Sequence, residues 1–461
     1  MSVHFRDLAA RRHQRKAAET PVYSGGGMTL DRSAVPAVAA HSGVGLWVDR
    51  LRIPLVVADQ GFISGVNFFT NILLARFLGI EEFGRFTLAW MVVLFANSFQ
   101  SAAIIQPMLS VGPKQADADA EAYYGAVLVH QVVMAGFAFA VVFIGVEVCA
   151  VAEPSWGITN LAVPLAVAVL AGQTQDFFRR YFFVRGRTAT AVVSDGIRYL
   201  SQLILLYGIT NVFSSGLTSP MALWIISAAA ALGTVPGAVC LEKLTLSRKV
   251  LQQTTKRHWQ VSKWLLPSAL MHWTTAQAFI IIAGGVLGAA VVGMMRAAMA
   301  VVGVVHIVYL GMENFAPIHA AQIFHRHGCG ALHRYIKSLT WKAGGAILLL
   351  LLIINLNATS ITWLMFGGDY SELSPLLLAF SVIYFVALLN VILGIWALAI
   401  EWTRIIFISL IAMTAVTLVT AYPFVVFGGV AGALFGAFLV ELIRGGIQFT
   451  ALYRGASATS G

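Results

Sequence analysis

The sequence LSPLLLAFSVIYFVALLNVILGIWALAI, residues 373–400, contains no charged side chain. A helix of about 20 residues crosses the roughly 30 Å hydrocarbon core of a bilayer, so this stretch is long enough to span a membrane. From Pro54 onward the chain carries about a dozen apolar stretches of similar length. The sequence therefore predicts an all-α, polytopic membrane protein with about twelve transmembrane helices. The predicted helices are 54–75, 83–106, 123–148, 160–180, 189–210, 220–241, 264–286, 289–311, 343–357, 373–400, 403–427 and 429–452.

Composition excludes the common soluble classes. Of the 461 residues, 59% are hydrophobic and 11% are charged, which a water-soluble domain could not expose without aggregating. The segments between the predicted helices are too short to hold a soluble catalytic domain, and no motif for covalent catalysis or nucleotide binding appears. We therefore expect a protein that is not an enzyme and has no cofactor. His325, His327, Cys329 and His333 match no established metal signature, so we expect no metal site.

The positive charge gives the orientation. The chain has 30 Lys and Arg against 20 Asp and Glu, and most of the cations fall in the N-terminal tail and in the loops after even-numbered helices. By the positive-inside rule these segments and both termini are cytoplasmic. The basic clusters then face lipid headgroups and water, and no nucleic-acid function follows.

A long polar segment divides the chain into two parts. We expect a basic, disordered cytoplasmic tail over 1–50, helix bundles of about six helices each over 51–241 and 264–452, a cytoplasmic linker over 242–263 and a second tail over 453–461. Leu78, Gly79 and Gly84 recur as Leu287, Gly288 and Gly293, each 209 positions further along. Such a repeat of two equal halves implies a pseudo-twofold axis along the membrane normal. Chance is the alternative, because Leu-Gly pairs are common in apolar sequences.

One arginine lies within a predicted helix without an acid nearby in sequence. Arg296 has only apolar residues three and four positions away, which excludes a salt bridge within its own helix. A charge in the hydrocarbon costs at least about 2.5 kcal/mol, so Arg296 must face an acid of another helix or a cavity that can hold an anion. Guanidinium suits the second role, because it can form two parallel hydrogen bonds to phosphate.

Three further arginines are candidates for binding the substrate. Arg198 and Arg444 each follow an acid by three positions, Asp195 and Glu441, so pairing within the helix is the simpler interpretation of both. Arg76 ends the first predicted helix, where reaching the headgroups is the simpler interpretation.

Polar side chains in the helices complete the candidate set. Asn67 and Asn71 are four positions apart, so they share one face of a helix that could bind a sugar-like cargo. Asp59, Asp176 and Glu313 lie at or inside helix ends and are candidates for coupling to a cation; pairing or solvation is the alternative for each. Several amides in the first half suggest a hydrated lining, with hydrogen bonding between helices as the alternative.

Two segments resemble a known family of transporters. The stretch NFFTNILLARFLGIEEFGRFTLAW, Asn67 to Trp90, resembles the first hairpin of Wzx-type polysaccharide flippases, in the multidrug/oligosaccharidyl-lipid/polysaccharide exporter (MOP) superfamily. DFFRRYFFVRGRTATAVVSDGIRYLSQ, Asp176 to Gln202, is similar to the junction of that family's fourth and fifth helices. The matching residues are Ala75, Arg76, Leu78, Gly79, Phe83 and Gly84 in the first segment, and Asp176, Arg179, Arg180, Arg187, Asp195 and Arg198 in the second. The second half of the chain matches in helix count and little else.

The resemblance implies a V-shaped pair of six-helix bundles in the bacterial inner membrane, open alternately to either side. Such proteins move undecaprenyl-pyrophosphate-linked oligosaccharides to the outer leaflet, some are thought to use H⁺ or Na⁺ gradients, and polysaccharide polymerase and export machinery are the implied partners. Arg296 and Arg198 are then the first candidates for the diphosphate. A multidrug/cation antiporter of the same superfamily is the alternative, and a membrane-embedded polysaccharide polymerase or ligase is a third possibility.

Overall fold

The described part of the chain is helical. The computed structural model describes residues 43–153, 156–212, 216–367 and 373–457, and these contain helices and no strands. Most of the tail predicted over 1–50, and residues 458–461 of the C-terminal tail, lie outside the described residues. Eight of the described helical stretches are long and apolar enough to cross a membrane. The chain is therefore a multi-pass membrane protein.

The helices of the first half are α2 (Gly43–Gln100), η2 (Ser101–Ile105), α3 (Gln106–Val111), η3 (Gly112–Lys114), α4 (Asp117–Ala152), η5 (Thr159–Leu161), α5 (Ala162–Val184), α6 (Thr188–Val212) and α7 (Ser219–Val239). Those of the second half are α8 (Arg248–Leu287), α9 (Ala289–Val302), η6 (Gly303–Val305), α10 (His306–Leu356), α11 (Ala358–Phe366), α12 (Ser374–Ala399) and α13 (Thr403–Ser457). Two segments that lie between predicted helices are helical: most of the predicted linker 242–263 belongs to α8, and 326–342 belongs to α10 apart from a kink at Gly328. Those predictions were wrong because a helix that continues beyond the hydrocarbon no longer needs apolar side chains.

Three of the longest helices are divided by a glycine. Gly79 in α2, Gly328 in α10 and Gly429 in α13 have positive φ and non-helical backbone, so each of these helices consists of two arms. Gly288 has a positive φ as well, and it separates α8 from α9. Side chains disfavour this conformation, which is why glycine occupies these positions.

The short sequence repeat corresponds to a repeated local structure. Gly79 and Gly288 have nearly the same backbone angles, φ 73° and ψ 173° against φ 94° and ψ 167°. Five residues after each, Gly84 of α2 and Gly293 of α9 pack against the opposite backbone. A Cβ on Gly84 would lie 1.7 Å from the carbonyl oxygen of Ala289, and one on Gly293 would lie 2.1 Å from that of Ile80. The two contacts are reciprocal under the 209-residue shift.

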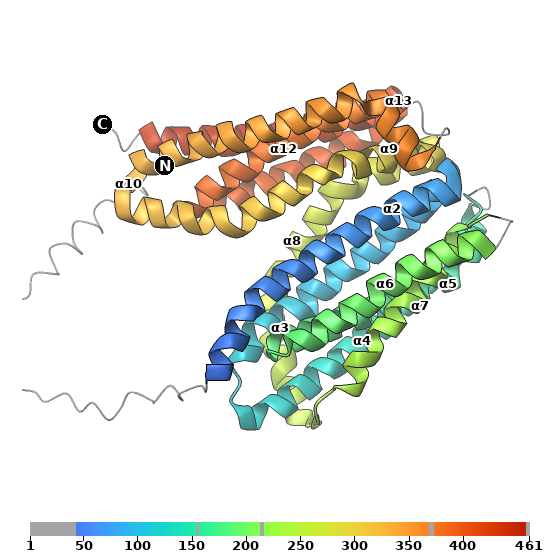
Figure 1. Ribbon diagram of the computed structural model, residues 1–461, viewed down its shortest axis with the longest axis vertical. Helices are drawn as coiled ribbons and strands as arrows, with labels where there is room; N and C mark the ends of the chain where they lie inside the picture. Colours follow the sequence, from blue (N-terminus) through green and yellow to red (C-terminus); the bar gives the residue numbers. More distant parts are fainter. Residues whose placement is uncertain (1–42, 154–155, 213–215, 368–372, 458–461) are drawn as a thin grey trace, which may run out of the picture.

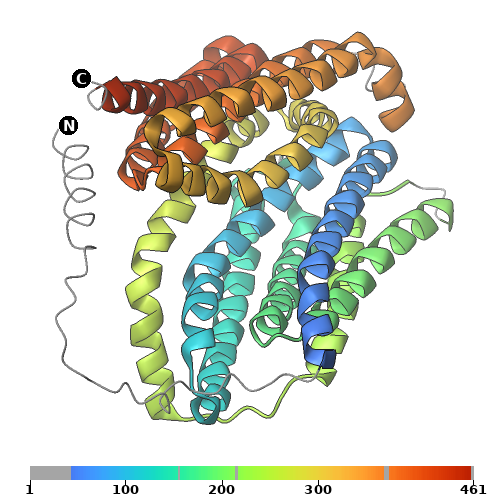
Figure 2. The ribbon, with the colours of Figure 1, turned by 60° about the vertical axis from the view of Figure 1, so that its left-hand side comes forward.

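The helices form two groups that meet at this contact. Helices α2 to α7 form one group, and α9, α10, α12 and α13 form the other; the groups approach each other where α2 meets α9 and diverge towards the opposite end (Figure 1). Helix α8 has 40 residues and so extends about 60 Å, twice the hydrocarbon thickness. It passes from α4 and η2 of the first group to α13 of the second (Figure 2).

Helix α8 also supports the end of the second arm of α2. Pro107 has no N–H to donate to the carbonyl of Ala103 four residues earlier, and a π-helical turn, η2, lies at this point. The hydroxyl of Ser262 in α8 donates a hydrogen bond to that carbonyl at 3.1 Å. This bond satisfies an acceptor that the proline leaves without its helical partner.

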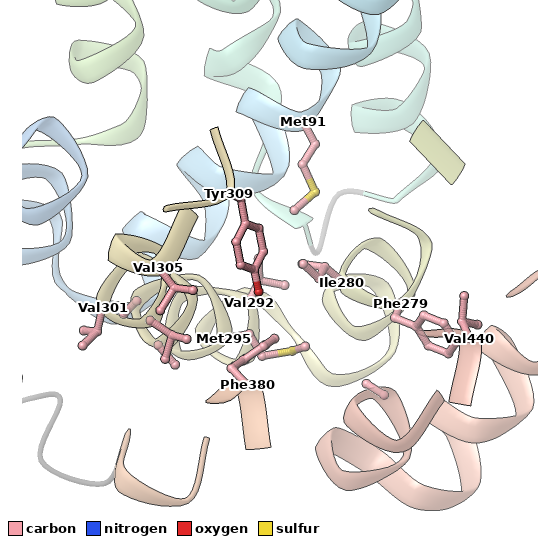
Figure 3. Close-up of a cluster of buried hydrophobic side chains, with 14 of the residues drawn as sticks. Met91, Phe279, Ile280, Val292, Met295, Val301, Val305, Tyr309, Phe380 and Val440 are labelled. Atoms are coloured by element: carbon pink, nitrogen blue, oxygen red, sulfur yellow. The ribbon is translucent and has the colours of Figure 1, made fainter. Parts of the chain in front are cut away.

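The apolar core extends through both groups of helices. One buried cluster includes Met91 of α2 together with Met295 of α9 and Phe380 of α12. Figure 3 shows Tyr309 of α10 among the side chains of this cluster. Its hydroxyl donates a hydrogen bond to the backbone carbonyl of Tyr384 in α12. This bond gives the Tyr309 hydroxyl a defined partner inside the core.

Candidate functional site

Arg296 lies on α9 and is half-buried; α9 itself packs against α2 of the first group and α12 of the second. Among the described residues no carboxylate lies within ion-pair distance of its guanidinium. Its electrostatic interaction is with the hydroxyl of Tyr384 on α12, a neutral group. The sequence left two alternatives for Arg296, an acid of another helix or a cavity that holds an anion. The described residues give no support to the first.

A second polar group lies between α12 and α13. Arg444 pairs with Glu441 of the same helix at 3.8 Å, as the three-residue spacing predicts. The amide of Asn390 donates to the Glu441 carboxylate at 2.7 Å and to the Glu441 backbone carbonyl at 2.9 Å. Glu441 is thus satisfied by its neighbours. Arg296 and Arg444 together supply two positive charges against the single negative charge of Glu441.

The first group of helices holds a buried ionic network that connects α2, α5 and α6. Arg179 of α5 donates from Nε to Asp195 of α6 at 2.5 Å and from a terminal nitrogen to Asp59 of α2 at 3.0 Å. Asp59 and Asp195 are 3% and 0% exposed. One guanidinium therefore holds two carboxylates away from water, and the second oxygen of Asp59, Oδ1, is buried without a hydrogen-bond partner among the described residues.

Arg198 does not pair with Asp195, contrary to the simpler interpretation of their spacing. Its guanidinium donates to the side-chain amide oxygen of Gln175 on α5, and it lies over the ring of Tyr199 with 5.0 Å between the guanidinium carbon and the ring centroid. The spacing places Arg198 and Asp195 on one face of α6, but it does not decide which cation the carboxylate meets. Arg179 of α5 is the cation that pairs with Asp195.

The other candidates lie outside this network. Asp176 pairs with Arg180 on α5 at 3.5 Å, and both side chains are partly exposed. Arg76 and Glu313 are exposed. Asn67 is also exposed, and Asn71 donates to its backbone carbonyl at 2.8 Å, so the two asparagines share a helix face as predicted. The structure thus brings Asp59 and Arg198 into one network and leaves the other predicted residues of the first half apart from it.

The buried amides of the first half connect helices. Gln100 of α2 donates to Gln131 of α4 at 2.8 Å and to the backbone carbonyl of Gln173 in α5 at 2.7 Å. Gln202 of α6 donates to Thr70 of α2 at 2.9 Å. These four glutamines are at most 4% exposed. These glutamines therefore form hydrogen bonds between helices and do not form the hydrated lining that the sequence suggested.

Sequence reasoning missed Arg179 as a buried charge. Arg179 lies one residue from the cytoplasmic end of the predicted helix 160–180, where a basic side chain is expected to face water, whereas α5 continues to Val184. The available signal was the four-residue spacing of Gln175 and Arg179, which places both on one helix face. Within the described residues, no group of three His, Cys, Asp or Glu side chains could hold a metal ion.

The fold and the buried charges define a multi-pass helical membrane protein with ionic groups in both groups of helices. The fold is similar to that of MOP-superfamily transporters. A multidrug resistance MATE family transporter in an inward-facing conformation aligns with a TM-score of 0.66 and 13% identity, over 87% of this chain and 96% of that chain. The lipid II flippase MurJ in an inward closed conformation aligns with a TM-score of 0.63 and 11% identity, over 87% of both chains.

A third solved structure, of a MOP-superfamily transporter from Pyrococcus furiosus, aligns with a TM-score of 0.55 and 14% identity, over 90% of this chain and 96% of that chain. No protein-family model and no curated protein matches the sequence. Identities this low establish a common fold and leave the cargo to be argued from the residues of this chain.

Proposed function

We propose that the protein is a Wzx-type flippase of the bacterial inner membrane. It moves undecaprenyl-pyrophosphate-linked polysaccharide repeat units from the cytoplasmic to the outer leaflet by alternating access. The observation that carries the proposal is Arg296, a guanidinium within an apolar helix that has no carboxylate partner among the described residues. A diphosphate headgroup is too polar to cross hydrocarbon unaided. A cation in the membrane that has no acidic partner would offer this headgroup a binding site.

The architecture supports this mechanism. The glycine kinks divide α2, α10 and α13 into arms. We propose that each arm and each remaining long helix crosses the membrane once, which would give about twelve passes in two sets of six. With both termini cytoplasmic, the turn at Gly79 lies on the outer side. The contact of Gly84 and Gly293 then closes the outer end, and the divergence of the groups towards the other end suits cargo entry from the cytoplasm.

The charges of the two groups suit different tasks. In the second group Arg296 and Arg444 outnumber Glu441, so an anion would be attracted there. In the first group Asp59 and Asp195 share Arg179, and Arg198 is connected to them only through the neutral amide of Gln175. We propose that coupling to H⁺ or Na⁺ acts through Asp59 and the carboxylate that shares Arg179 with it, Asp195. Oδ1 of Asp59 is buried and has no hydrogen-bond partner among the described residues. Asp176 and Glu313, which are more exposed, are weaker candidates for this role.

Two measurements in cells test the cargo. Deletion of the gene should trap undecaprenyl-linked glycan on the cytoplasmic face, which lipid extraction would reveal. The Arg296→Ala variant should lose glycan export while the protein stays at normal abundance, because only the headgroup contact is removed. Arg404→Ala, a change at an exposed arginine outside the candidate site, is the matched control and should export normally. Full export by a normally expressed Arg296→Ala variant would reject the assignment.

A multidrug/cation antiporter is the second candidate. The buried carboxylates Asp59 and Asp195 favour it, because acids in a transport cavity attract cationic compounds. The same deletion strain separates the two candidates: unchanged lipid-linked glycan together with increased sensitivity to cationic dyes would favour the antiporter.

A further inference from the structure

Gln175 occupies the junction between the paired carboxylates and Arg198. Its side chain is fully buried. The amide nitrogen donates to Oδ1 of Asp195 at 2.8 Å, and the amide oxygen accepts a hydrogen bond from Arg198. These two bonds fix the orientation of the amide, because only its nitrogen can donate and only its oxygen can accept. One side chain therefore contacts both an acid and the arginine that is a candidate for the diphosphate.

The acid at this junction has an incomplete charge balance. Asp59 and Asp195 share the single guanidinium of Arg179, so two negative charges meet one positive charge. Two carboxylates that share a site cannot both stay ionised without electrostatic cost, so one of them is a position where a proton can be added. Asp195 is the one whose other oxygen contacts Gln175.

The charged groups around Asp195 come from three helices. Arg179 faces it from α5 and Asp59 faces it from α2. On α6 itself the nearby charged side chain is Arg198, and Asp176 and Arg180 of α5 pair with each other. Helix α7, which packs against α5 and α6, contains no ionisable side chain. The charge state of Asp195 is thus set by Arg179 and Asp59, and it reaches Arg198 through Gln175.

Among the described residues, Arg198 is hydrogen-bonded to a neutral group and pairs with no carboxylate. Its terminal nitrogen bonds to the Gln175 amide, and its Nε is buried without a hydrogen-bond partner among the described residues. A guanidinium bonded to a carboxylate is held more strongly than one bonded to an amide. Arg198 can therefore be released at lower cost than Arg179.

We propose that Gln175 is a positioning residue that makes the availability of Arg198 depend on the charge of Asp195. When the carboxylate of Asp195 takes a proton from water, its new O–H must donate, and the amide of Gln175 turns its oxygen towards it. The amide nitrogen then faces Arg198, so two donors meet and the guanidinium is released to bind a diphosphate. This inference rests on the proposed function, in which that diphosphate is the headgroup of the cargo.

The test uses purified full-length protein in lipid nanodiscs and geranyl diphosphate as the probe, with its affinity measured at one pH. Asp195→Asn places a neutral group that can donate next to Gln175, so it should bind the probe at least about fivefold more tightly than the wild type, as expected for coupling between two sites. In a Gln175→Met background the same change should alter the affinity by less than about twofold. Glu242→Gln, which removes a negative charge outside the network, is the control for charge alone.

The coupling of Asp195 to Arg198 through Gln175 is called the relay here. The outcomes separate the relay from the proposed function. If the wild type does not bind geranyl diphosphate, both are overturned. If the wild type binds but Asp195→Asn brings no gain, or the gain persists with Gln175→Met, the relay alone is overturned. Should Gln175→Met not fold, Gln175→Glu serves instead. Its carboxylate holds Arg198 whatever the state of Asp195, so probe binding should weaken and the Asp195→Asn gain should disappear.

Discussion

At the scale of single residues, Arg179 and Arg180 show how burial decides the value of an ion pair. The two are adjacent on α5, and each contacts acids. Arg179 is 11% exposed and joins two nearly inaccessible carboxylates, whereas Arg180 is 41% exposed and meets one partly exposed partner. Removing one partner of a buried pair leaves an uncompensated charge, while an exposed pair is replaced by water.

We therefore predict different costs for two neighbouring substitutions. Arg179→Leu should destabilise the folded protein by about 3 to 5 kcal/mol, because Asp59 and Asp195 lose their shared cation. Arg180→Leu should cost less than about 1 kcal/mol. Thermal unfolding of the purified variants in one detergent checks the difference. Equal stability of the two variants would contradict the ionic network.

At the scale of elements, the two glycine contacts between α2 and α9 control how closely the helices approach. Gly84→Ala places a Cβ within 1.7 Å of a backbone oxygen, which only separation of the helices can relieve. The outer ends should therefore move apart. Spin labels at Glu81 and Val286, in a background without native cysteines, should show a longer distance distribution in this variant than in the unsubstituted protein.

The chain offers a matched control for this substitution. Gly65 lies on the same helix, and a Cβ added there meets no atom within 4 Å. Gly65→Ala should leave the distance distribution unchanged, and Gly293→Ala should repeat the effect of Gly84→Ala. If Gly84→Ala leaves the distance unchanged, the close contact of the two backbones is not what sets the outer end.

The helices that could be predicted from sequence are those whose position depends on hydrophobicity alone. An apolar run has one favourable environment, so the predicted helix 373–400 differs from α12, Ser374–Ala399, by one residue at each end. The Glu441–Arg444 pair could also be predicted, since it depends only on helix geometry. The helical parts of 242–263 and 326–342 could not, because polar residues outside the hydrocarbon are compatible with helix or loop.

The ionic network could not be predicted for a different reason. Arg179 and Asp59 are 120 positions apart, and their contact depends on how α5 packs against α2. No local pattern contains that information. The same packing pairs Asp195 with Arg179 of α5. The spacing on α6 had instead favoured a pair between Asp195 and Arg198.

At the scale of the whole molecule, the two groups of helices differ in charge. The first contains two acids that share Arg179 and are connected to Arg198 through Gln175, and the second contains more positive than negative charge. The groups are in contact at the end where α2 meets α9, and α8 passes between them. In a transporter that alternates between two openings, such a division would place the shared carboxylates and the excess of positive charge in the two parts that move relative to each other.

The most direct test of this account is a translocation measurement in proteoliposomes. Purified protein is reconstituted with a fluorescently labelled polyprenyl-diphosphate oligosaccharide, and its appearance in the opposite leaflet is followed with a membrane-impermeant quencher. The account predicts that the wild-type protein accelerates translocation and that Arg296→Ala does not. Translocation by Arg296→Ala at the wild-type rate, or no acceleration by the wild-type protein, would contradict it.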